Sequence, residues 1–253
     1  MKLRHINLIN NRLLPVLEVL EVASAKLLEF LILLFMVFWI GAAFAFGVVT
    51  SISLFANKAH AAIPAEAAQY KRELIRAARY EFGLDAPVAL IAAQIHQESQ
   101  WKRDAVSPVG AQGLAQFMPA TARWLPDVVP SLRAAEQGEL ADTPKEKMPF
   151  NPAWALRAVC AYNRWLLFQI KNTHTPADHW AFVLSAYNGG LGWVNRDRKL
   201  AAQQGYDPAR YWGHVEMVNA GRSAANIREN RQYPSKIFAR APEYAAAGWG
   251  AMP

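Results

Sequence analysis

The side chain with the clearest capacity for chemistry is Glu98, a carboxyl at the end of an apolar helical pattern. Steps of three and then four residues back from Glu98 reach Ile95 and Ile91, so the carboxyl shares a helix face with an apolar stripe. Burial against hydrocarbon raises the pKa of a carboxyl, as a general acid working near neutral pH requires. An ion pair with Lys102 or Arg103 at the helix end is the alternative. Glu98 is therefore a candidate general acid, and the surrounding motifs must decide between this role and the ion pair.

The helix that carries Glu98 belongs to a mostly α-helical domain. Helical periodicity recurs along the C-terminal part of the chain, and alternating β-branched runs are few. We expect one helix over Glu66–Phe82, stopped by Gly83, and the next over Pro87–Ser99, opened by Asp85-Ala86-Pro87. The later expected elements are a loop over 100–113, a helix over 114–125, a surface excursion over 126–151, helices over 154–170 and 179–188, and a less regular remainder that is partly loop.

Composition and charge limit what the chain can be and bind. Of its 253 residues, 53% are hydrophobic and 19% are charged, which excludes a disordered or collagen-like chain. Cys160 is the single cysteine, which excludes an intramolecular disulfide framework and a zinc site built on several thiolates. The net charge of +7 favours an acidic partner, namely nucleic acid, anionic lipid or an anionic wall polymer. Because Lys and Arg are scattered rather than clustered, we expect no nucleic-acid partner.

The remaining polar residues imply no metal and no cofactor. His174 and His179 lie five apart with no partner cysteine and no HExxH-type spacing. The run Gly189-Gly190-Leu191-Gly192 follows an expected helix, a context that excludes a dinucleotide-binding loop. We therefore expect chemistry performed by side chains alone.

An apolar segment near the N-terminus indicates a membrane. Residues 30–56 read FLILLFMVFWIGAAFAFGVVTSISLFA and contain no charged residue, whereas about 20 such residues already span a bilayer. We expect a cytoplasmic segment over 1–29, a transmembrane or signal-anchor helix over 30–56, a linker over 57–65 and the main domain over 66–253. Ala59-His60-Ala61 fits a signal-peptidase site, so cleavage after Ala61 is the alternative to the retained anchor that the long apolar run favours.

Four segments together resemble the soluble lytic transglycosylase family. They read HQESQW, SPVGAQGLAQFMPATA, SAYNGG and ENRQYPSKI, in this order. The family has a Glu-Ser pair at a helix end, then Gly-Leu-x-Gln-x-x-Pro, then Ala-Tyr-Asn-Gly, and finally Glu-x-x-x-Tyr. The resemblance covers about residues 70 to 238, and the long polar stretch after Gly192 is similar to bacteriophage and prophage lysins of this family.

The resemblance implies a lysozyme-like α domain that cleaves peptidoglycan glycan strands between N-acetylmuramic acid and N-acetylglucosamine. Glu98 takes the catalytic role, first as acid and then as base, and the C6 hydroxyl of the muramic acid closes a 1,6-anhydro ring. A second carboxylate then becomes optional, unlike in glycosidases with paired carboxylates.

The resemblance also assigns residues to the substrate cleft. Ser99 and Ser107 fall on positions that support the glutamate or contact the saccharide, and a tyrosine hydroxyl near Glu98 could hold the carboxyl in place. Met118, like Phe117, is expected at the cleft floor or in the core. The expected substrate-binding residues are Ser99, Ser107, Gln116, Met118, Tyr187, Asn188, Glu229 and Tyr233. Arg222, Arg228 and Arg231 could meet carboxylates of the wall, although a solvated basic face is the commoner explanation.

Two other activities stay open at this point. A goose-type lysozyme-like hydrolase would need a second carboxylate, and Asp104 is the acidic residue close by in sequence. In a non-catalytic wall-binding or assembly module of a secretion or conjugation machine, the cleft would have no catalytic activity. Since the substrate lies outside the cytoplasmic membrane, we expect an inner-membrane protein whose domain faces the periplasm, or is released there by cleavage. Phage-type host lysis by a membrane-tethered endolysin is the favoured setting, and local opening of the wall for a secretion, conjugation or remodelling machine is the alternative.

Overall fold

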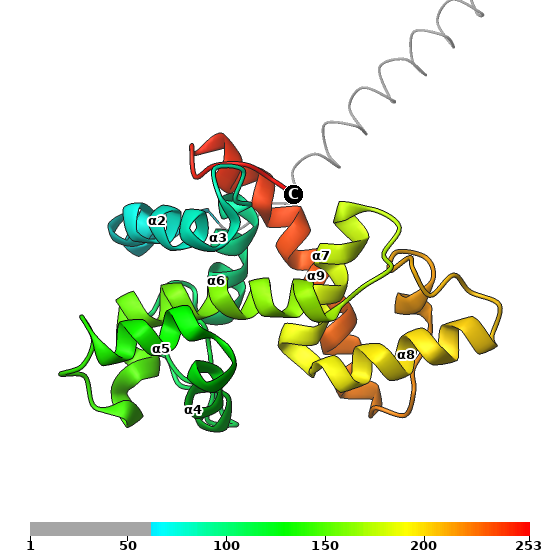
Figure 1. Cartoon of the computed structure of the whole chain (residues 1–253). Helices are drawn as coiled ribbons and strands as arrows, with labels where there is room; N and C mark the ends of the chain where they lie inside the picture. The colour runs from blue at the N-terminus through cyan, green and yellow to red at the C-terminus, as the bar shows by residue number, and fades with distance from the viewer. Residues whose placement is uncertain (1–61) are drawn as a thin grey trace, which may run out of the picture. The chain divides into compact units, whose positions relative to one another are not determined.

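The computed structural model describes residues 62–253, and the regular secondary structure of this part of the chain is helical (Figure 1). The α-helices are α2 Lys71–Phe82, α3 Val88–Ser99, α4 Pro119–Val128, α5 Pro130–Gln137, α6 Pro152–Gln169, α7 Pro176–Gly189, α8 Leu191–Gln203 and α9 Ala224–Ala246. The short 3₁₀ helices are η1 Ala65–Tyr70, η2 Lys145–Phe150 and η3 Val215–Met217. The prediction of a mostly α domain is confirmed. The expected segments 1–29 and 30–56, and most of the linker, lie outside the described residues.

Within residues 62–253, every helix is too short or too polar to traverse a lipid bilayer.

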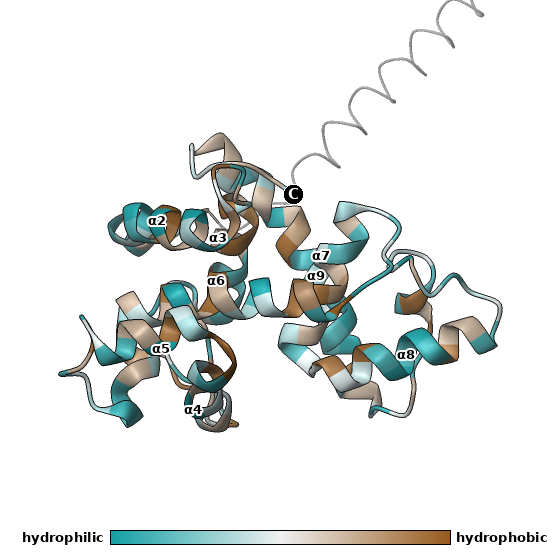
Figure 2. Cartoon of the chain, in the orientation of Figure 1, coloured by the Kyte–Doolittle hydropathy of each residue, from teal (hydrophilic) through white to brown (hydrophobic). Residues whose placement is uncertain are grey.

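The centre of the domain is α3, a helix that is apolar on nearly every side. Residues 88–96 are all buried, as expected of a helix packed by neighbours all round. Figure 2 shows brown, hydrophobic segments alternating with teal, hydrophilic ones along the helices of the domain. Its main packing partner is α9, which in turn packs against α7. The helices α6 and α7 contact each other, and α2 covers α6 from another side. Helix α3 is thus held mainly by α9, with a smaller contact to α2.

Several expected boundaries are confirmed, and their caps explain them. The chain leaves α2 at Gly83, whose φ of +79° favours glycine. Helix α6 begins after Asn151, whose side chain accepts hydrogen bonds from Ala153 N at 3.0 Å and Trp154 N at 3.4 Å. Pro87 stands at the N-cap of α3 rather than in its first turn.

The helix expected over residues 114–125 begins later, at Pro119. Gln112 and Phe117 instead exchange backbone hydrogen bonds of 3.0 and 3.1 Å, which fold residues 113–116 into a tight turn. Gln116 within this turn has a φ of +49°, which no α-helix accommodates. Pro126 lies inside α4, which continues to Val128 and so beyond the expected end at residue 125.

Two segments contain more helix than expected, although the part after residue 190 is also partly loop, as expected, over residues 204–214 and 218–223. Residues 126–151 form α5 and η2, because Val129, Leu132 and Ala135 recur every three residues and are buried. The part after residue 190 contains α8 and the 23-residue helix α9. The buried stripe of α9 is Asn230, Tyr233, Ile237, Ala241 and Tyr244, a 3–4 spacing that opens on a polar residue.

Candidate active site

Glu98 occupies the last turn of α3, at the point where the chain reverses. Gln100 and Trp101 follow with φ of +53° and +65°, an uncommon conformation for residues other than glycine. The Trp101 side chain is buried and its Nε1 donates to the hydroxyl oxygen of Tyr244 on α9, at 2.6 Å. This anchor fixes the turn directly behind Glu98.

A cleft of about 360 Å³ opens beside Glu98 and gathers most of the expected site residues. Its lining includes Glu98, Ser107, Gln116, Met118, Tyr187, Asn188, Glu229 and Tyr233, from four separate parts of the sequence. Ser99 does not line the cleft. Gln97, Val109, Ala111 and Thr121 also line it; they lie within the quoted sequence segments but were not assigned to the cleft. Tyr162 lines it as well and lies outside those segments.

The environment of Glu98 favours its protonated form. Burial raises the pKa of the Glu98 carboxyl to about 8, although the hydroxyl of Tyr233, which donates to Oε1, lowers that pKa, and the nearby Glu229 carboxylate raises it. At neutral pH this carboxyl therefore carries a proton that it can give to a bound group. Such a pKa is typical of a general acid.

Tyr233 is the tyrosine that holds Glu98. Burial raises the pKa of the Tyr233 hydroxyl well above its usual value, with the neighbouring Glu98 charge adding to the rise. The hydroxyl thus stays protonated and keeps donating. Tyr187 is directed elsewhere, because its hydroxyl donates to the carbonyl oxygen of Ala115 at 2.8 Å.

Ser99 supports the glutamate from behind rather than facing the cleft. Its side chain is buried, and its hydroxyl donates to the carbonyl oxygen of Leu114 at 2.8 Å, with the Ile95 carbonyl oxygen a more distant acceptor at 3.4 Å. The bond to Leu114 ties the last turn of α3 to the loop that carries Gln116. Of the two roles left open for Ser99, the structure is consistent with support.

Gln116 and Ser107 are held in the loop between α3 and α4. The Gln116 Nε2 donates to the carbonyl oxygens of Ala105 at 3.1 Å and Gly113 at 2.9 Å, so its Oε1 is the atom left to face the cleft. Ser107 Oγ accepts from the Ala111 N–H at 3.0 Å. Gly113 has a φ of +74°, and a Cβ there would lie 1.7 Å from the Pro149 carbonyl oxygen, so only glycine fits.

Aromatic rings form one wall of the cleft. Tyr162 and Tyr187 have ring centroids 5.3 Å apart, and Phe117 lies 5.7 Å from Tyr187. Met118, at the rim, is 42% exposed, and Phe117 is buried below it. An apolar wall opposite a few polar groups is typical of sites that bind sugars or other amphipathic ligands.

The fold and the cleft agree with a family match. A family model described as "Transglycosylase SLT domain" matches residues 73–209, more than half of the chain. The chain belongs to the transglycosylase SLT domain family. The match contains Glu98, Gln116 and Tyr187, whereas Glu229 and Tyr233 lie beyond it and join the cleft through the packing of α9 on α3.

Other members with this domain are similar to the chain over part of their length. Membrane-bound lytic murein transglycosylase F of Mannheimia succiniciproducens is 27% identical over 168 residues, covering 66% of this chain and 29% of that protein. The protein of the same name from Histophilus somni strain 2336 is 31% identical over 166 residues, covering 59% and 31%. The chain thus spans less than a third of the length of these curated relatives. A solved structure, the 70 kDa soluble lytic transglycosylase of Escherichia coli, is 22% identical with a TM-score of 0.47, covering 73% of this chain and 25% of that one.

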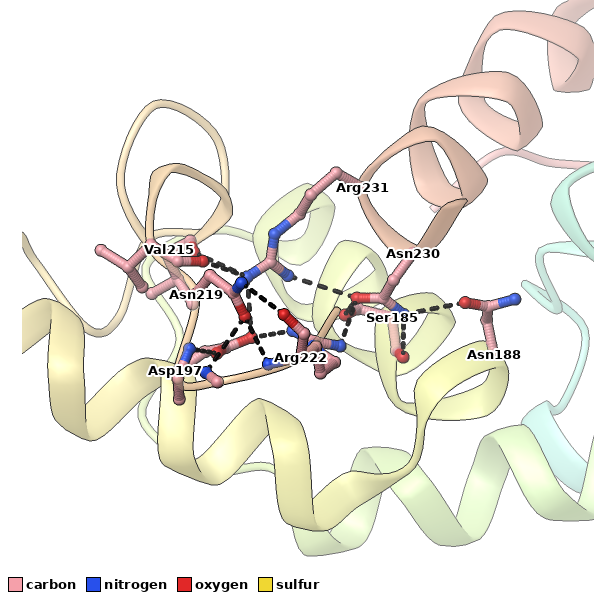
Figure 3. Close-up of polar contacts among 11 residues, drawn as sticks. Ser185, Asn188, Asp197, Val215, Asn219, Arg222, Asn230 and Arg231 are labelled. Carbon is pink, nitrogen blue, oxygen red and sulfur yellow. Dashed lines mark hydrogen bonds and ion pairs between the residues drawn. The ribbon is translucent and has the colours of Figure 1, made fainter. Parts of the chain in front are cut away.

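Two expectations about charged residues of this SLT domain are corrected. Arg222 and Arg231 point inward, where both guanidinium groups contact the buried carboxylate of Asp197, the latter at 2.7 Å (Figure 3). They are thus engaged within the fold rather than presented to wall carboxylates. Asp104 is exposed and is not part of the cleft lining, so the second carboxyl of the cleft is Glu229.

Proposed function

We propose that this chain is a peptidoglycan lytic transglycosylase that cleaves the β-1,4 bond between N-acetylmuramic acid and N-acetylglucosamine and forms 1,6-anhydro-N-acetylmuramic acid. The observation that carries the proposal is Glu98, a carboxyl protonated at neutral pH, hydrogen-bonded by Tyr233 and open to a cleft. Membership of the SLT domain family supports it, as do relatives named lytic murein transglycosylases.

In the first step Glu98 acts as the acid. Its carboxyl gives its proton to the glycosidic oxygen, and the bond between that oxygen and the anomeric carbon breaks. N-acetylglucosamine leaves with a free C4 hydroxyl. The carboxylate that remains accepts the Tyr233 hydroxyl bond, which is stronger to a charged oxygen than to a neutral one.

In the second step the same group acts as the base. The Glu98 carboxylate takes the proton of the muramic acid C6 hydroxyl, whose oxygen bonds to the anomeric carbon and closes the anhydro ring. Glu98 is again protonated, no water is consumed, and the two products together have the mass of the substrate. The internal hydroxyl has a high effective concentration that favours ring closure over attack by water.

The other cleft residues position the glycan in this proposal. The Oε1 of Gln116 and the Ser107 hydroxyl face sugar hydroxyls and acetamido groups, for which amides and hydroxyls are suited. Tyr187 and Met118 contribute apolar surface for sugar C–H groups. Asn188 and Glu229 contribute polar groups at the side formed by α7 and α9.

Hydrolysis is the second candidate, favoured by a single observation. Glu229 is an exposed carboxyl in the same cleft, and a carboxylate on the far side of a sugar can activate a water molecule. The two activities differ in their products, because hydrolysis adds the atoms of one water molecule and leaves a reducing end.

The test is a digest of purified peptidoglycan in water enriched in ¹⁸O, using the full chain in detergent and a Glu98→Gln control. Anhydromuropeptides without ¹⁸O from the wild type alone would support the proposal. Reducing-end products that contain ¹⁸O would establish the hydrolase. Binding to peptidoglycan without products from either protein would indicate a wall-binding module.

We further propose that residues 30–56 anchor the chain in the inner membrane and that residues 66–253 face the periplasm. The uncharged apolar run supports an anchor, and the matched relatives are named membrane-bound. Cleavage after Ala61 would release the domain instead. Fractionation of cells, followed by N-terminal sequencing of the chain, separates the two outcomes. Host lysis is the setting that we favour for either form.

A further inference from the structure

Behind the cleft, a buried polar cluster connects α7, α8 and α9 through Asn230 (Figure 3). Asn230 is 1% exposed, and its Oδ1 accepts hydrogen bonds from Ser185 Oγ at 2.8 Å, Arg222 Nη1 at 2.9 Å and Arg231 Nη1 at 3.3 Å. Its Nδ2 donates to the Ser185 carbonyl oxygen at 2.8 Å and to Asn188 Oδ1 at 2.9 Å. Every hydrogen-bonding atom of this amide is therefore occupied.

The two arginines determine which way the Asn230 amide is turned. A guanidinium group only donates hydrogen bonds, so the Asn230 atom that faces Arg222 and Arg231 must be its oxygen. Its nitrogen then faces the Ser185 carbonyl and Asn188. The arginines are themselves held by Asp197, a fully buried carboxylate that contacts both.

The same logic extends one residue further, to the cleft. Because Asn230 Nδ2 donates, the Asn188 atom that receives it must be Oδ1. The Asn188 Nδ2 is then turned toward the Glu229 carboxylate, 3.5 Å from its Oε1, at the lining of the cleft. Asn188 thus offers the second N–H of its Nδ2 to whatever the cleft binds, while its Oδ1 accepts from Asn230.

We propose that Asn230, oriented by the Asp197–Arg222–Arg231 cluster, is a positioning residue that fixes Asn188 as a hydrogen-bond donor to the substrate. The group it recognises is then an acceptor, such as the carbonyl oxygen of an acetamido group or a carboxylate. The identity of that substrate rests on the proposed function, whereas the orientation of Asn188 does not.

Gly189 shows how closely the cluster approaches the backbone. A Cβ at this position would lie 2.7 Å from Asn230 Nδ2 and 3.1 Å from Arg222 Nη1. Position 189 must therefore hold a glycine for the hydrogen bonds among Arg222, Asn230 and Asn188 to form. Gly192 offers a matched contrast, because a Cβ there would meet nothing within 4 Å.

The primary variant is Asn230→Asp in the full chain. Two guanidinium groups face one carboxylate in the cluster, so an ionised aspartate at 230 balances the charge. The change also removes the hydrogen bond to the Ser185 carbonyl oxygen, a cost that Gly189→Ala does not share, so the two variants are read together. The aspartate cannot donate to Asn188, whose Oδ1 would face a carboxylate oxygen. The Asn188 amide must turn or move, and the donor is lost from the cleft. Asn226→Asp makes the same chemical change at an exposed position of α9 and is the control.

The first readout is the side-chain amide NMR signal of Asn188, assigned by its absence from Asn188→Ala. We expect this signal to shift in Asn230→Asp and in Gly189→Ala, and to stay in place in Asn226→Asp and Gly192→Ala. An unchanged Asn188 signal in Asn230→Asp would overturn the proposal. This readout needs no turnover, so an inactive wild type would refute the proposed function and leave the test intact.

The second readout is a double-mutant cycle on kcat/KM with peptidoglycan strands. We expect Asn188→Ala and Asn230→Asp each to lower kcat/KM about tenfold, chiefly through KM, as the loss of one hydrogen bond predicts. The double variant should fall no lower than Asn188→Ala, since both changes remove the same donor. Losses that multiply would mean that Asn230 acts independently of Asn188. Gly189→Ala provides the same comparison without a change of charge.

Discussion

The hydroxyl of Tyr233 donates a hydrogen bond to Oε1 of Glu98, although the two residues lie 135 positions apart in the sequence. The contact depends on the packing of α9 against α3, which brings the last turn of one helix beside the middle of the other. The protonation of Glu98 therefore depends on the packing of α9 against α3. The pH dependence of activity and of stability is for this reason a direct test of the site.

Activity should fall at alkaline pH because Glu98 must start as the acid. Its pKa of about 8 in the folded chain places the loss of the catalytic proton around that pH. We expect kcat/KM to decrease about tenfold per pH unit above this value. Initial rates on peptidoglycan from pH 5 to 10 would measure it, and an alkaline limb centred near pH 5 would contradict a buried acid.

Glu98→Gln should lower kcat at least about 100-fold while leaving the fold intact, because the amide cannot transfer the proton. The circular dichroism spectrum and peptidoglycan binding should be retained. Residual activity above a tenth of wild type would show that another group supplies the proton.

The same carboxyl should make stability depend on pH. A glutamate titrates near 4.5 in the unfolded chain and at about 8 in the folded one, so between these values only the folded chain keeps the proton. The free energy of unfolding should therefore decrease as pH rises through this window, by up to about 1.4 kcal/mol per pH unit. His96, whose pKa burial lowers to about 4 with Arg240 adding to the effect, acts in the opposite sense.

Comparison with Glu98→Gln separates these contributions, because His96 is common to both proteins. Urea unfolding at pH 5, 6, 7 and 8 should show the variant gaining stability relative to wild type as pH rises. A constant difference between the two proteins across this range would mean that Glu98 is not protonated in the folded state.

The sequence predicted those parts of the site that depend on residues close together in the chain. Glu98 was placed by the 3–4 spacing of Ile91 and Ile95 on its own helix, and the structure has that helix at Val88–Ser99. Tyr162 was missed because its helix is dominated by core residues, so nothing marked one face of it as cleft. The turn at Gln116 was predicted to be helix, because the positive φ of this residue cannot be recognised from the spacing of apolar residues.

The C-terminal part shows the limit most clearly. Its longest helix has a buried stripe that begins with Asn230, and Pro234 and Pro242 lie within it. A proline inside a helix and a polar residue on its buried face both run against the local sequence pattern of a helix. The helix is favoured by hydrogen bonds that Asn230 accepts from Arg222 and from Ser185, which is 45 residues away in the sequence. A pattern of neighbouring residues cannot reveal such a long-range contact.

Tyr233→Phe should raise the pKa of Glu98 further, because the lost hydrogen bond is one that lowers it. The alkaline limb of the pH profile should move to higher pH, and kcat should fall about tenfold as the carboxyl loses its fixed position. Tyr187→Phe is the matched control, since its hydroxyl bonds the Ala115 carbonyl and not Glu98. Tyr187→Phe should lower the free energy of unfolding by about 1 kcal/mol. The alkaline limb of its pH profile should stay where it is in the wild type.

Glu229→Gln should have the opposite effect on Glu98. The negative charge of Glu229 raises the pKa of Glu98, so its removal should shift the alkaline limb to lower pH. If ring closure needs one carboxyl, the variant should still form anhydro products at acidic and neutral pH. If Glu229 instead activates water, the wild type should yield reducing ends and the variant should lose them. Mass spectrometry of the digests, alongside the pH profile, separates a residue that tunes Glu98 from a second catalytic carboxylate.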